Sequence, residues 1–596
     1  MKQAPKFVFL AVIILFLAPA VFPAGGQQDQ GRGGSAAAAV PTGKLTVKAQ
    51  YGDEKYYPKP ATGWTANPKY PQQPPVSGVN EFPIVANKVN LKIATPYYSY
   101  VTDYENNDLT KYMEELTNVH IVWELLPEVN PMEKINLMFS AGDALPDVFM
   151  GCNFPSSMLI TLGAGGLATP LQDLIERNGY NLKALFEANP RMYPVMLSAD
   201  GNVYALGDQT LNDANKLSMR FWINKKFLDA LGMKMPATTD EYYEYLKAVK
   251  TRDPNKNGRA DEIPLVGATE GWHAEIDGFL MNAFAYNETN TDRNPSTRTR
   301  AYITNNGKID VSYNKPEWKQ GLEYLHKLYA EGLLAPESFT LHKEDLRGLV
   351  EYEGASIVGS LPSGGPHEFA NTQGERRKDF VALPPLKGPN GVQQIWFDEF
   401  MAERAGRYLV TKDCKIPDIA IKWADYCYTE DFFTRNRYGV LGRDWKIPPA
   451  GTVAVSGGDA KYEEILKWGT PQNAYWGVNV PQWNRFASYM RGKSNDPYEL
   501  EYVLWNAKVA YEPYAFKRSV PRVLAFTSDE ARRYSELNRL IIEYVEQSLA
   551  RFVTGELDLN RDWNTYLTNL NRMGLNDLLN ITQAAFDRQW KKALGY

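Results

Sequence analysis

The chain has 596 residues, a mass of 67.4 kDa, and 65 basic against 70 acidic side chains. A single hydrophobic core stops growing at roughly 250–300 residues, so this length predicts at least two lobes. The acidic balance excludes strong electrostatic binding of nucleic acid, which needs a basic face. Having only 3 cysteines excludes a disulfide-rich scaffold. The cysteine count leaves open a disulfide between Cys414 and Cys427 and the state of Cys152.

Residues 1–24 have the pattern of an export signal. Lys2 and Lys6 precede an apolar run, Phe7–Leu17, that is too short to span a bilayer comfortably. Cleavage fits after Ala20 or after Ala24, and a retained membrane anchor is the alternative. No cysteine that could carry a lipid lies near the cleavage region, so no lipobox is present. We therefore expect a periplasmic or otherwise extracytoplasmic protein.

Two unusual stretches follow the signal. Residues 25–43 are rich in Gly, Gln and Ala, which predicts a flexible linker. Residues 44–86 carry many prolines with interleaved Tyr and Trp, and prolines at that density oppose helices and central strands. We expect an extended segment that lies on the surface of the main body and is anchored by its aromatic side chains. A disordered linker is the alternative.

From Val89 onward, strand and helix patterns alternate. They predict a strand at 89–93, a helix through 109–116, a strand at 119–123, a helix from 131 to 142 and a strand at 147–150. This order implies a parallel sheet with helices packed on it.

A second unit begins near 221–224. Its predicted elements are a helix capped by Thr238 and Glu241, a strand at 355–359, a long helix from Ser528 to about Val553 that is ended by Gly555, and further helices broken at Gly574. The predicted domains are a signal peptide (1–24), a linker (25–43), a Pro-rich segment (44–86), an N-terminal lobe (87–208 plus about 355–410), and a C-terminal lobe (209–354 plus about 411–596) with a helical tail.

The sharpest local motif is DPNKNGRADE at 253–262. Oxygen-bearing side chains occupy loop positions 1, 3, 5 and 9 with Gly at 6, as in the front of an EF-hand calcium loop. Position 12 is Pro264 instead of Glu, so Glu262 would supply the closing carboxylate, and Arg259 only its backbone carbonyl. The predicted ligands are Asp253, Asn255, Asn257, Arg259, Asp261 and Glu262.

Ligands that are all oxygen favour structural Ca²⁺ and leave Mg²⁺ open. A plain turn rich in Asn and Asp is the alternative to a metal site. The five histidines show no zinc-site spacing, and no nucleophile elbow, phosphate loop or dinucleotide fingerprint occurs. Acidic pairs such as Asp398-Glu399 leave a glycosidase open.

Several short stretches carry a family resemblance over about Asn87 to the C-terminus. They are ALPDVF (144–149), GLATPLQDL (166–174), DGNVYAL (200–206), WIN through LGM (222–233), DEIPL (261–265) and RYG (437–439). In their order they resemble the extracellular solute-binding proteins of family 1, in the branch with lipoprotein-like and alginate-binding members.

The resemblance implies a two-lobed α/β clamp of the type II periplasmic-binding-protein kind, in which the chain crosses between the lobes more than once and ligand binding closes a hinge. It also implies calcium on the loop at 253–262. The missing lipobox cysteine and the Pro-rich segment depart from the family pattern.

A carbohydrate site needs aromatic rings for the apolar face of a sugar and planar polar groups for its hydroxyls. The candidates are Trp272, Trp396, Asp398, Glu399, Tyr97, Asn153, Asn215, Arg220, Tyr438, Arg443, Trp445 and Trp476. Core packing is the alternative for each aromatic residue and is expected for Trp222, Trp423 and Trp590. Arg220 and Arg443 leave an acidic sugar open.

We therefore predict a monomeric substrate-binding component of an ABC importer that binds an oligosaccharide and delivers it to permease subunits in the membrane, without catalysis and without nucleic acid. The alternatives are an extracellular polysaccharide-degrading enzyme, a binding protein for peptides or other small solutes, and a surface adhesion protein.

Overall fold

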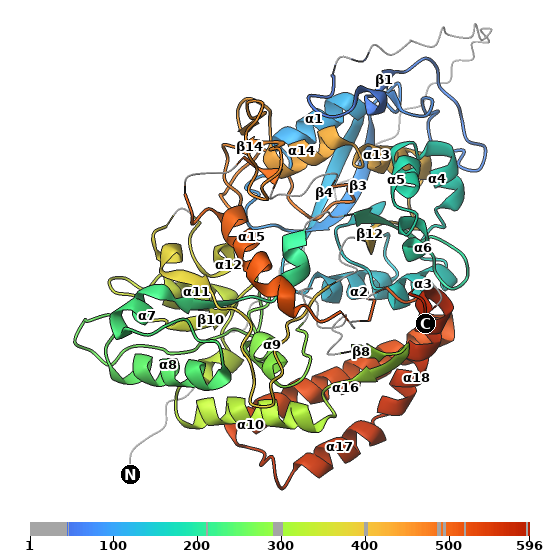
Figure 1. The fold of residues 1–596 in the computed structure, drawn as a ribbon. Helices are drawn as coiled ribbons and strands as arrows, with labels where there is room; N and C mark the ends of the chain where they lie inside the picture. Colours follow the sequence, from blue (N-terminus) through green and yellow to red (C-terminus); the bar gives the residue numbers. More distant parts are fainter. Residues whose placement is uncertain are drawn as a thin grey trace, which may run out of the picture. The chain divides into compact units, whose positions relative to one another are not determined.

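In the computed structural model, a five-stranded sheet in the order β4-β3-β5-β12-β6 forms the centre of the first lobe (Figure 1). Its strands are β3 (Val89–Pro96), β4 (Val119–Leu126), β5 (Val148–Met150), β6 (Ala205–Gln209) and β12 (Glu403–Val410). As predicted, β3, β4 and β5 run parallel, whereas β12 runs antiparallel to β5 and β6.

The structure describes residues 45, 47–209, 213–289, 302–372, 374–398, 403–484, 490–492, 496–517, 520–521, 523–591 and 594–596. The predicted signal peptide and linker lie outside these residues.

Helices cover both faces of the five-stranded sheet. Along β5, Val148 and Met150 enter one core cluster and Phe149 the other, as the two-residue period of a strand requires. The first face is covered by α1 (Asp108–Thr117), α4 (Gln172–Asn178), α5 (Asn181–Ala188), α6 (Met192–Met196), α13 (Pro417–Tyr426) and α14 (Glu430–Tyr438). The other is covered by α2 (Pro131–Ala141) and α3 (Ser156–Ala164).

The second lobe is built on a three-stranded antiparallel sheet in the order β10-β7-β11. Its strands are β7 (Phe221–Asn224), β10 (Ser360–Pro362) and β11 (Phe380–Ala382). The strand expected at 355–359 therefore starts later, because Val358 forms only an isolated bridge with Ile263.

Helices and one hairpin surround this second sheet. They are α7 (Lys225–Leu231), α8 (Thr239–Thr251), α9 (Ile276–Leu280), α10 (Pro316–Ala330), α11 (Lys343–Val350), α12 (Pro366–Phe369), and β8 (Tyr302–Asn305) with β9 (Lys308–Val311); the 3₁₀ turns are η2 (Asp213–Leu217), η3 (Met281–Ala283), η5 (Pro336–Phe339) and η6 (Arg376–Asp379). The predicted cap of α8 is present in part. Thr238 accepts from the backbone N–H of Glu241 at 3.1 Å, while the Glu241 carboxylate accepts from Ala237.

The lobe boundaries differ from the predicted ones. The stretch 355–382 was expected in the first lobe, but β10 and β11 pair with β7, which puts it in the second. The stretch from 411 to 483 was expected in the second lobe, but α13 and α14 pack on the first sheet. The reason is burial, because Ile419 and Trp423 reach a core only against that sheet. The chain crosses between the sheets at 209–221 and at 382–403.

The C-terminal part is mostly helical. After the short pair β13 (Trp445–Lys446) and β14 (Glu463–Glu464) come α15 (Leu500–Tyr511), η8 (Glu512–Tyr514), α16 (Ser528–Thr554), α17 (Trp563–Arg572), α18 (Leu575–Phe586) and the π-turn η9 (Asp587–Lys591). As predicted, α16 ends at Gly555 and α17 and α18 are separated near Gly574; Thr527 and Glu530 form a full capping box at the start of α16. α16 lies against α10 and α3 (Figure 1).

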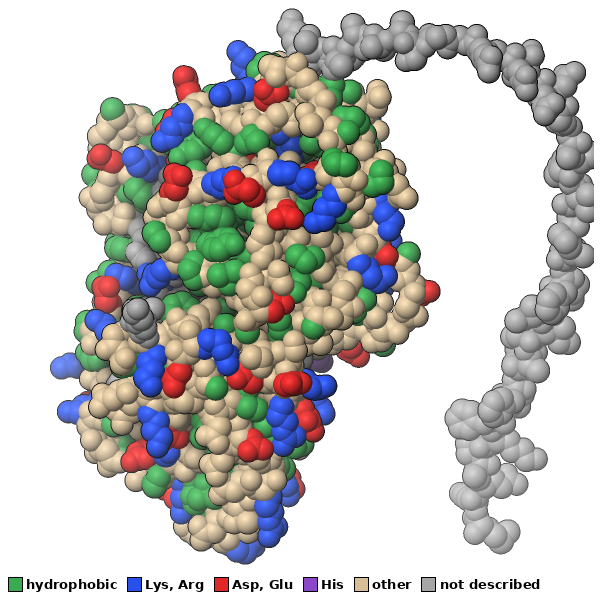
Figure 2. All heavy atoms as spheres, turned by 90° about the vertical axis from the view of Figure 1, so that its right-hand side faces the viewer, with side chains coloured by type: hydrophobic (Ala, Val, Ile, Leu, Met, Phe, Trp, Pro, Cys, Tyr) green, Lys and Arg blue, Asp and Glu red, His purple; other side chains and the backbone are tan. Residues whose placement is uncertain are grey.

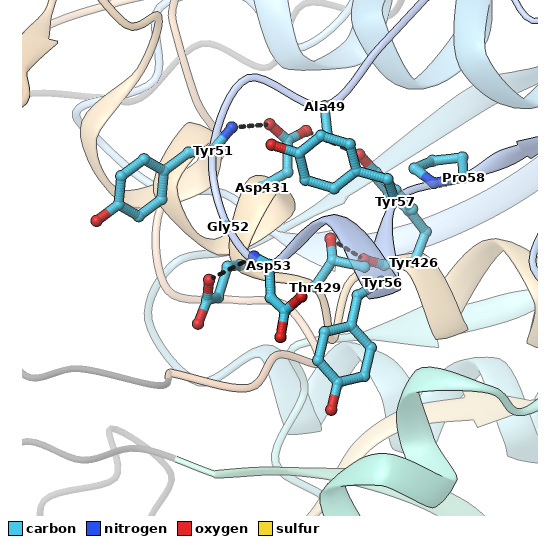
Figure 3. Close-up of a pocket in the computed structure, with 11 residues that line it drawn as sticks. Ala49, Tyr51, Gly52, Asp53, Tyr56, Tyr57, Pro58, Tyr426, Thr429 and Asp431 are labelled. Atoms are coloured by element: carbon cyan, nitrogen blue, oxygen red, sulfur yellow. Dashed lines mark hydrogen bonds between the residues drawn. The ribbon is translucent and has the colours of Figure 1, made fainter.

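Residues 47–86, which we call the strap, follow the first lobe in extended form and contain η1 (Glu54–Tyr56), β1 (Lys59–Pro60) and β2 (Glu81–Phe82). Asn67 and Gln73 donate amide hydrogens to the buried carboxylate of Asp418 at 2.5 and 3.0 Å. In Figure 3, Tyr56 and Tyr57 lie beside Tyr426 around a hollow of about 10 Å³, which is the size of one water. The strap matches the expected surface segment and not the disordered alternative.

The surface carries mixed charge. On the face drawn in Figure 2, acidic and basic side chains are interspersed and do not gather into one basic patch. Among the described helices, none combines the length and the apolar character needed to cross a bilayer. Cys152, Cys414 and Cys427 are buried free thiols, so the Cys414–Cys427 bridge is absent.

Candidate functional site

Four rings form a continuous row in the second lobe, which we call the ring row. The ring centroids of Trp396 and His273 are 5.1 Å apart, those of His273 and Trp272 6.2 Å, and those of Trp272 and His367 5.8 Å. The row joins the segment after α8, the region of α12 and the segment after β11, which are distant in sequence.

Trp272 is held by close backbone packing. Its indole lies against Gly364, where an added Cβ would come within 2.1 Å of the ring, so only glycine fits this position. The guanidinium carbon of Arg220 lies 5.8 Å from the Trp272 ring centroid, and this guanidinium donates to the carbonyls of Ala214 and Gly364. Burial lowers the pKa of Arg220 to about 10.

Trp396 and His273 form the inner part of the ring row. Trp396 is only 1% exposed, and its Nε1 donates to a carboxylate oxygen of Glu288 at 3.2 Å. His273 Nε2 is hydrogen-bonded to the hydroxyl of Ser218 at 2.9 Å. Both polar ring atoms therefore have partners, as buried polar groups require.

The segment around η2 brings further predicted residues to the ring row. The backbone N–H of Asp398 donates to the carbonyl of Lys216 at 2.9 Å. Asn215, next in sequence, is half-buried, and its Oδ1 has no hydrogen-bond partner among the described residues. The structure thus brings together the predicted residues Trp272, Trp396, Arg220, Asn215 and Asp398.

Three other predicted aromatic residues lie in cores. Tyr438 and Trp445 are buried in a small cluster, where Tyr438 stacks on Tyr462 with centroids 3.9 Å apart. Trp476 is buried beneath the first sheet and donates its Nε1 to Thr110 at 2.8 Å. This burial favours the packing alternative for all three. The expected core residues Trp222, Trp423 and Trp590 are buried, as predicted.

The remaining predicted residues are not gathered at the ring row. Arg443 is paired with Asp108 and Asp444, each at 2.6 Å. Tyr97 is exposed at the end of β3, and Asn153 is half-buried just after β5. Glu399 lies outside the described residues.

A cavity of about 290 Å³ begins at the end of the ring row, since His367 also lines it. Trp468 lies on its wall, with the guanidinium carbon of Arg437 3.7 Å from the Trp468 ring centroid. The sequence interpretation missed Trp468. Its flanks, Lys467 and Gly469, are the polar and glycine context that singled out Trp272, so the same signal was present.

The predicted metal loop lies between α8 and the bridge of Ile263 with Val358. The Asp253 carboxylate accepts from the backbone N–H groups of Asn257 and Gly258 at 3.1 and 2.9 Å, which curls the chain around its own oxygens. The Asn257 amide donates to the Asp261 carboxylate at 3.0 and 3.1 Å.

The donor set of this loop fits calcium. Its side-chain donors are all oxygens, and Oε1 of Glu262 is buried with no hydrogen-bond partner among the described residues. Burial raises the pKa of Glu262, and the carboxylates of Asp253 and Asp261 raise it further, as expected where a cation would offset them. No described cluster of three or more His, Cys, Asp or Glu side chains is arranged as a metal site. The loop, however, would take two of its donors from Asn255 and Asn257.

Comparison with known proteins agrees with this architecture. The profile of the bacterial extracellular solute-binding protein family matches residues 96–431. The fructooligosaccharide ABC transporter substrate-binding protein FusA of Streptococcus pneumoniae is 26% identical over 508 residues, 80% of this chain and 86% of that protein. The polygalacturonan/rhamnogalacturonan-binding protein YtcQ of Bacillus subtilis is 22% identical over 48% of this chain and 53% of its own.

Solved structures share the two-lobed fold. FusA in complex with kestose superposes with a TM-score of 0.71 at 24% identity, covering 84% of this chain and 99% of that one. The alginate-binding protein AlgQ2 without calcium ion superposes with a TM-score of 0.65 at 21% identity, again covering 84% of this chain and 99% of that one. The comparisons therefore span relatives named for neutral and for acidic sugars.

Proposed function

The chain belongs to the bacterial extracellular solute-binding protein family, and on that premise we propose that it is the substrate-binding component of an ABC importer and takes an oligosaccharide. The proposal rests on the ring row, where Trp272 and its neighbours supply aromatic surface beside Asn215, Arg220 and Asp398. Rings beside planar polar groups suit the two chemical faces of a sugar. The likeness to FusA supports an oligosaccharide as ligand.

Binding without chemistry is the second part of the proposal. The protein would close on the sugar by a hinge at its crossings, 209–221 and 382–403, and present it as a monomer to the permease subunits. The N-terminal 24 residues would direct export and so place the protein outside the cytoplasm.

Structural calcium on the loop 253–262 completes the proposal. Asp253, Asn255, Asn257, Asp261 and Glu262 would hold the ion by side-chain oxygens and Arg259 by its carbonyl. Calcium there would neutralise the converging carboxylates and fix the loop beside the second sheet. The names of a FusA EF-hand mutant and of calcium-free AlgQ2 support calcium in this branch of relatives.

A titration and an activity assay together test the function. Tryptophan fluorescence would be followed during titration with fructooligosaccharides, neutral milk-type oligosaccharides, oligogalacturonates and a peptide mixture, and reducing sugar would be measured in parallel. We expect saturable binding of one sugar class without release of reducing ends. Release of reducing ends would show an enzyme, and saturation only with peptides would show a peptide-binding protein.

A further inference from the structure

The cavity of about 290 Å³ at the end of the ring row has walls from distant parts of the chain. Pro366, His367 and Arg377 line it from the second lobe. The rest of its lining includes Glu464, Lys467, Trp468, Arg491, Asp496, Tyr498, Glu499, Leu500 and Glu501. Its volume lies near the lower end of the roughly 300–1,000 Å³ found for small-molecule sites, which suits a single sugar unit better than a chain.

The charged side chains of this cavity are paired with one another. Arg491 contacts Glu464 at 3.0 Å and Glu499 at 2.7 Å, and Lys467 contacts Glu499 at 2.5 Å. Arg377 pairs with Asp496 at 3.3 Å.

Glu501, the remaining acidic residue of the lining, pairs through Oε1 with Arg437 at 3.1 Å. Every carboxylate of the lining therefore has a cationic partner. The cavity offers no unpaired cation to an acidic ligand and no carboxylate free of a cation to a basic one.

Several buried polar atoms of the lining have no hydrogen-bond partner among the described residues, including Nε of Arg377 and Nε of Arg491, whose guanidinium groups are held in ion pairs. Nδ1 of His367 and Oε2 of Glu501 make no hydrogen bond among the described residues, although His367 is 9% and Glu501 5% exposed. Burial lowers the pKa of His367, so the ring is neutral near pH 7. A neutral imidazole nitrogen and a carboxylate oxygen are good partners for hydroxyl groups, and unpaired buried polar atoms are otherwise costly.

We propose that this cavity is a subsite for one uncharged sugar unit, whose hydroxyls bond to Nδ1 of His367 and Oε2 of Glu501 while the rest of the oligosaccharide lies along the ring row. The inference rests on the proposed function and deepens it, since it selects a neutral sugar where the relatives include neutral and acidic binders. A uronate unit would bring its carboxylate close to the carboxylates of Glu499 and Glu501 with no free cation to offset it.

Isothermal titration with matched sugars tests the subsite. The panel holds neutral tri- and tetrasaccharides built from fructose, glucose or galactose, and tri- and tetragalacturonate. We expect the tightest binder to be neutral and the tetrasaccharide to bind more tightly than its trisaccharide. The His367→Phe variant keeps a ring beside Trp272 but removes Nδ1, so it should weaken tetrasaccharide binding at least tenfold while leaving the trisaccharide nearly unchanged.

His120→Phe is the matched control, because His120 lies on β4 and is paired with Glu114 away from the cavity. Glu501→Gln serves as a second variant should His367→Phe unfold, and it should show the same selective loss. Tighter binding of the galacturonates overturns the subsite, as does unchanged tetrasaccharide affinity in the folded variants. Absence of binding to every sugar overturns the proposed function itself, so the two failures are distinguishable.

Discussion

Trp272 is the half-buried member of the ring row, whereas Trp396 is part of the core. Removing the Trp272 ring should therefore affect the ligand more than the fold. We expect Trp272→Ala to weaken oligosaccharide binding at least tenfold with a small change in melting temperature. Trp64→Ala, a half-buried tryptophan of the strap, is the control and should bind as the parent does. If the parent, Trp272→Ala and Trp64→Ala bind the oligosaccharide with equal affinity, Trp272 does not contribute to the site.

His367 also predicts a pH dependence of stability. Burial keeps its folded pKa below the ordinary value of 6.5, so the unfolded chain takes up a proton first as the pH falls. The stabilising contribution is complete above about pH 6.5 and is lost as the pH decreases from there toward the lowered pKa, by at most about 1.4 kcal/mol per pH unit. Urea unfolding at pH 7.5, 6.5 and 5.5 should show a shallower pH slope in His367→Phe than in the parent. Identical slopes would contradict the prediction.

At the scale of elements, the calcium loop is the first to test. A ligand that binds only the folded state adds about 2.7 kcal/mol when present at 100 times its dissociation constant. We expect chelation with EDTA to lower the melting temperature and calcium to restore it. Glu262→Gln should lose this response, and Asp240→Asn, an exposed carboxylate on the neighbouring helix α8, should keep it. If EDTA leaves the melting temperature of the parent protein unchanged, the calcium site is ruled out.

The strap is the second element to test. Asp418 is 2% exposed and accepts from Asn67 and Gln73, so removing both amides leaves a buried carboxylate with fewer donors. Each hydrogen bond to a charge is worth about 1.5–3 kcal/mol, and we expect the Asn67→Ala, Gln73→Ala double variant to lose about 3 kcal/mol in urea unfolding. Lys69→Ala, which breaks an exposed strap ion pair with Asp173, should cost less than about 1 kcal/mol. A double variant as stable as the parent would show that the strap only lies on the surface.

For the whole molecule, binding should couple the two lobes. If one sugar spans the ring row and the cavity, hydrogen exchange should slow both in the second-lobe segment 363–398 and in the segment 464–484, part of which lines the cavity. Hydrogen exchange measured by mass spectrometry with and without the tightest-binding sugar checks this. Protection confined to 363–398 would mean that the ligand engages one lobe alone.

Local patterns in the sequence were enough to predict the parallel part of the first sheet, the cap of α8 at Thr238, the end of α16 at Gly555 and the glycine break at Gly574. Each of these features is set by residues close together in the sequence, either through the spacing of apolar side chains or through the backbone conformation that a capping residue or glycine allows. The ring row, as a candidate site, was predicted in part, because Trp272 and Trp396 stand in recognisable polar or glycine contexts. Trp468 stands in a similar context and was missed.

Long-range pairing was decided only by the tertiary structure. The stretch 355–382 pairs with β7 because strand pairing depends on which backbone edges come together in the folded chain. Helix α13 packs on the first sheet because Ile419 and Trp423 are buried there. The chain length, the charge balance and the cysteine count by themselves determined that the protein has more than one lobe and is neither strongly basic nor rich in disulfides. Folding decided which of its charges neutralise one another, because ion pairs such as Arg437–Glu501 join residues that no sequence spacing connects.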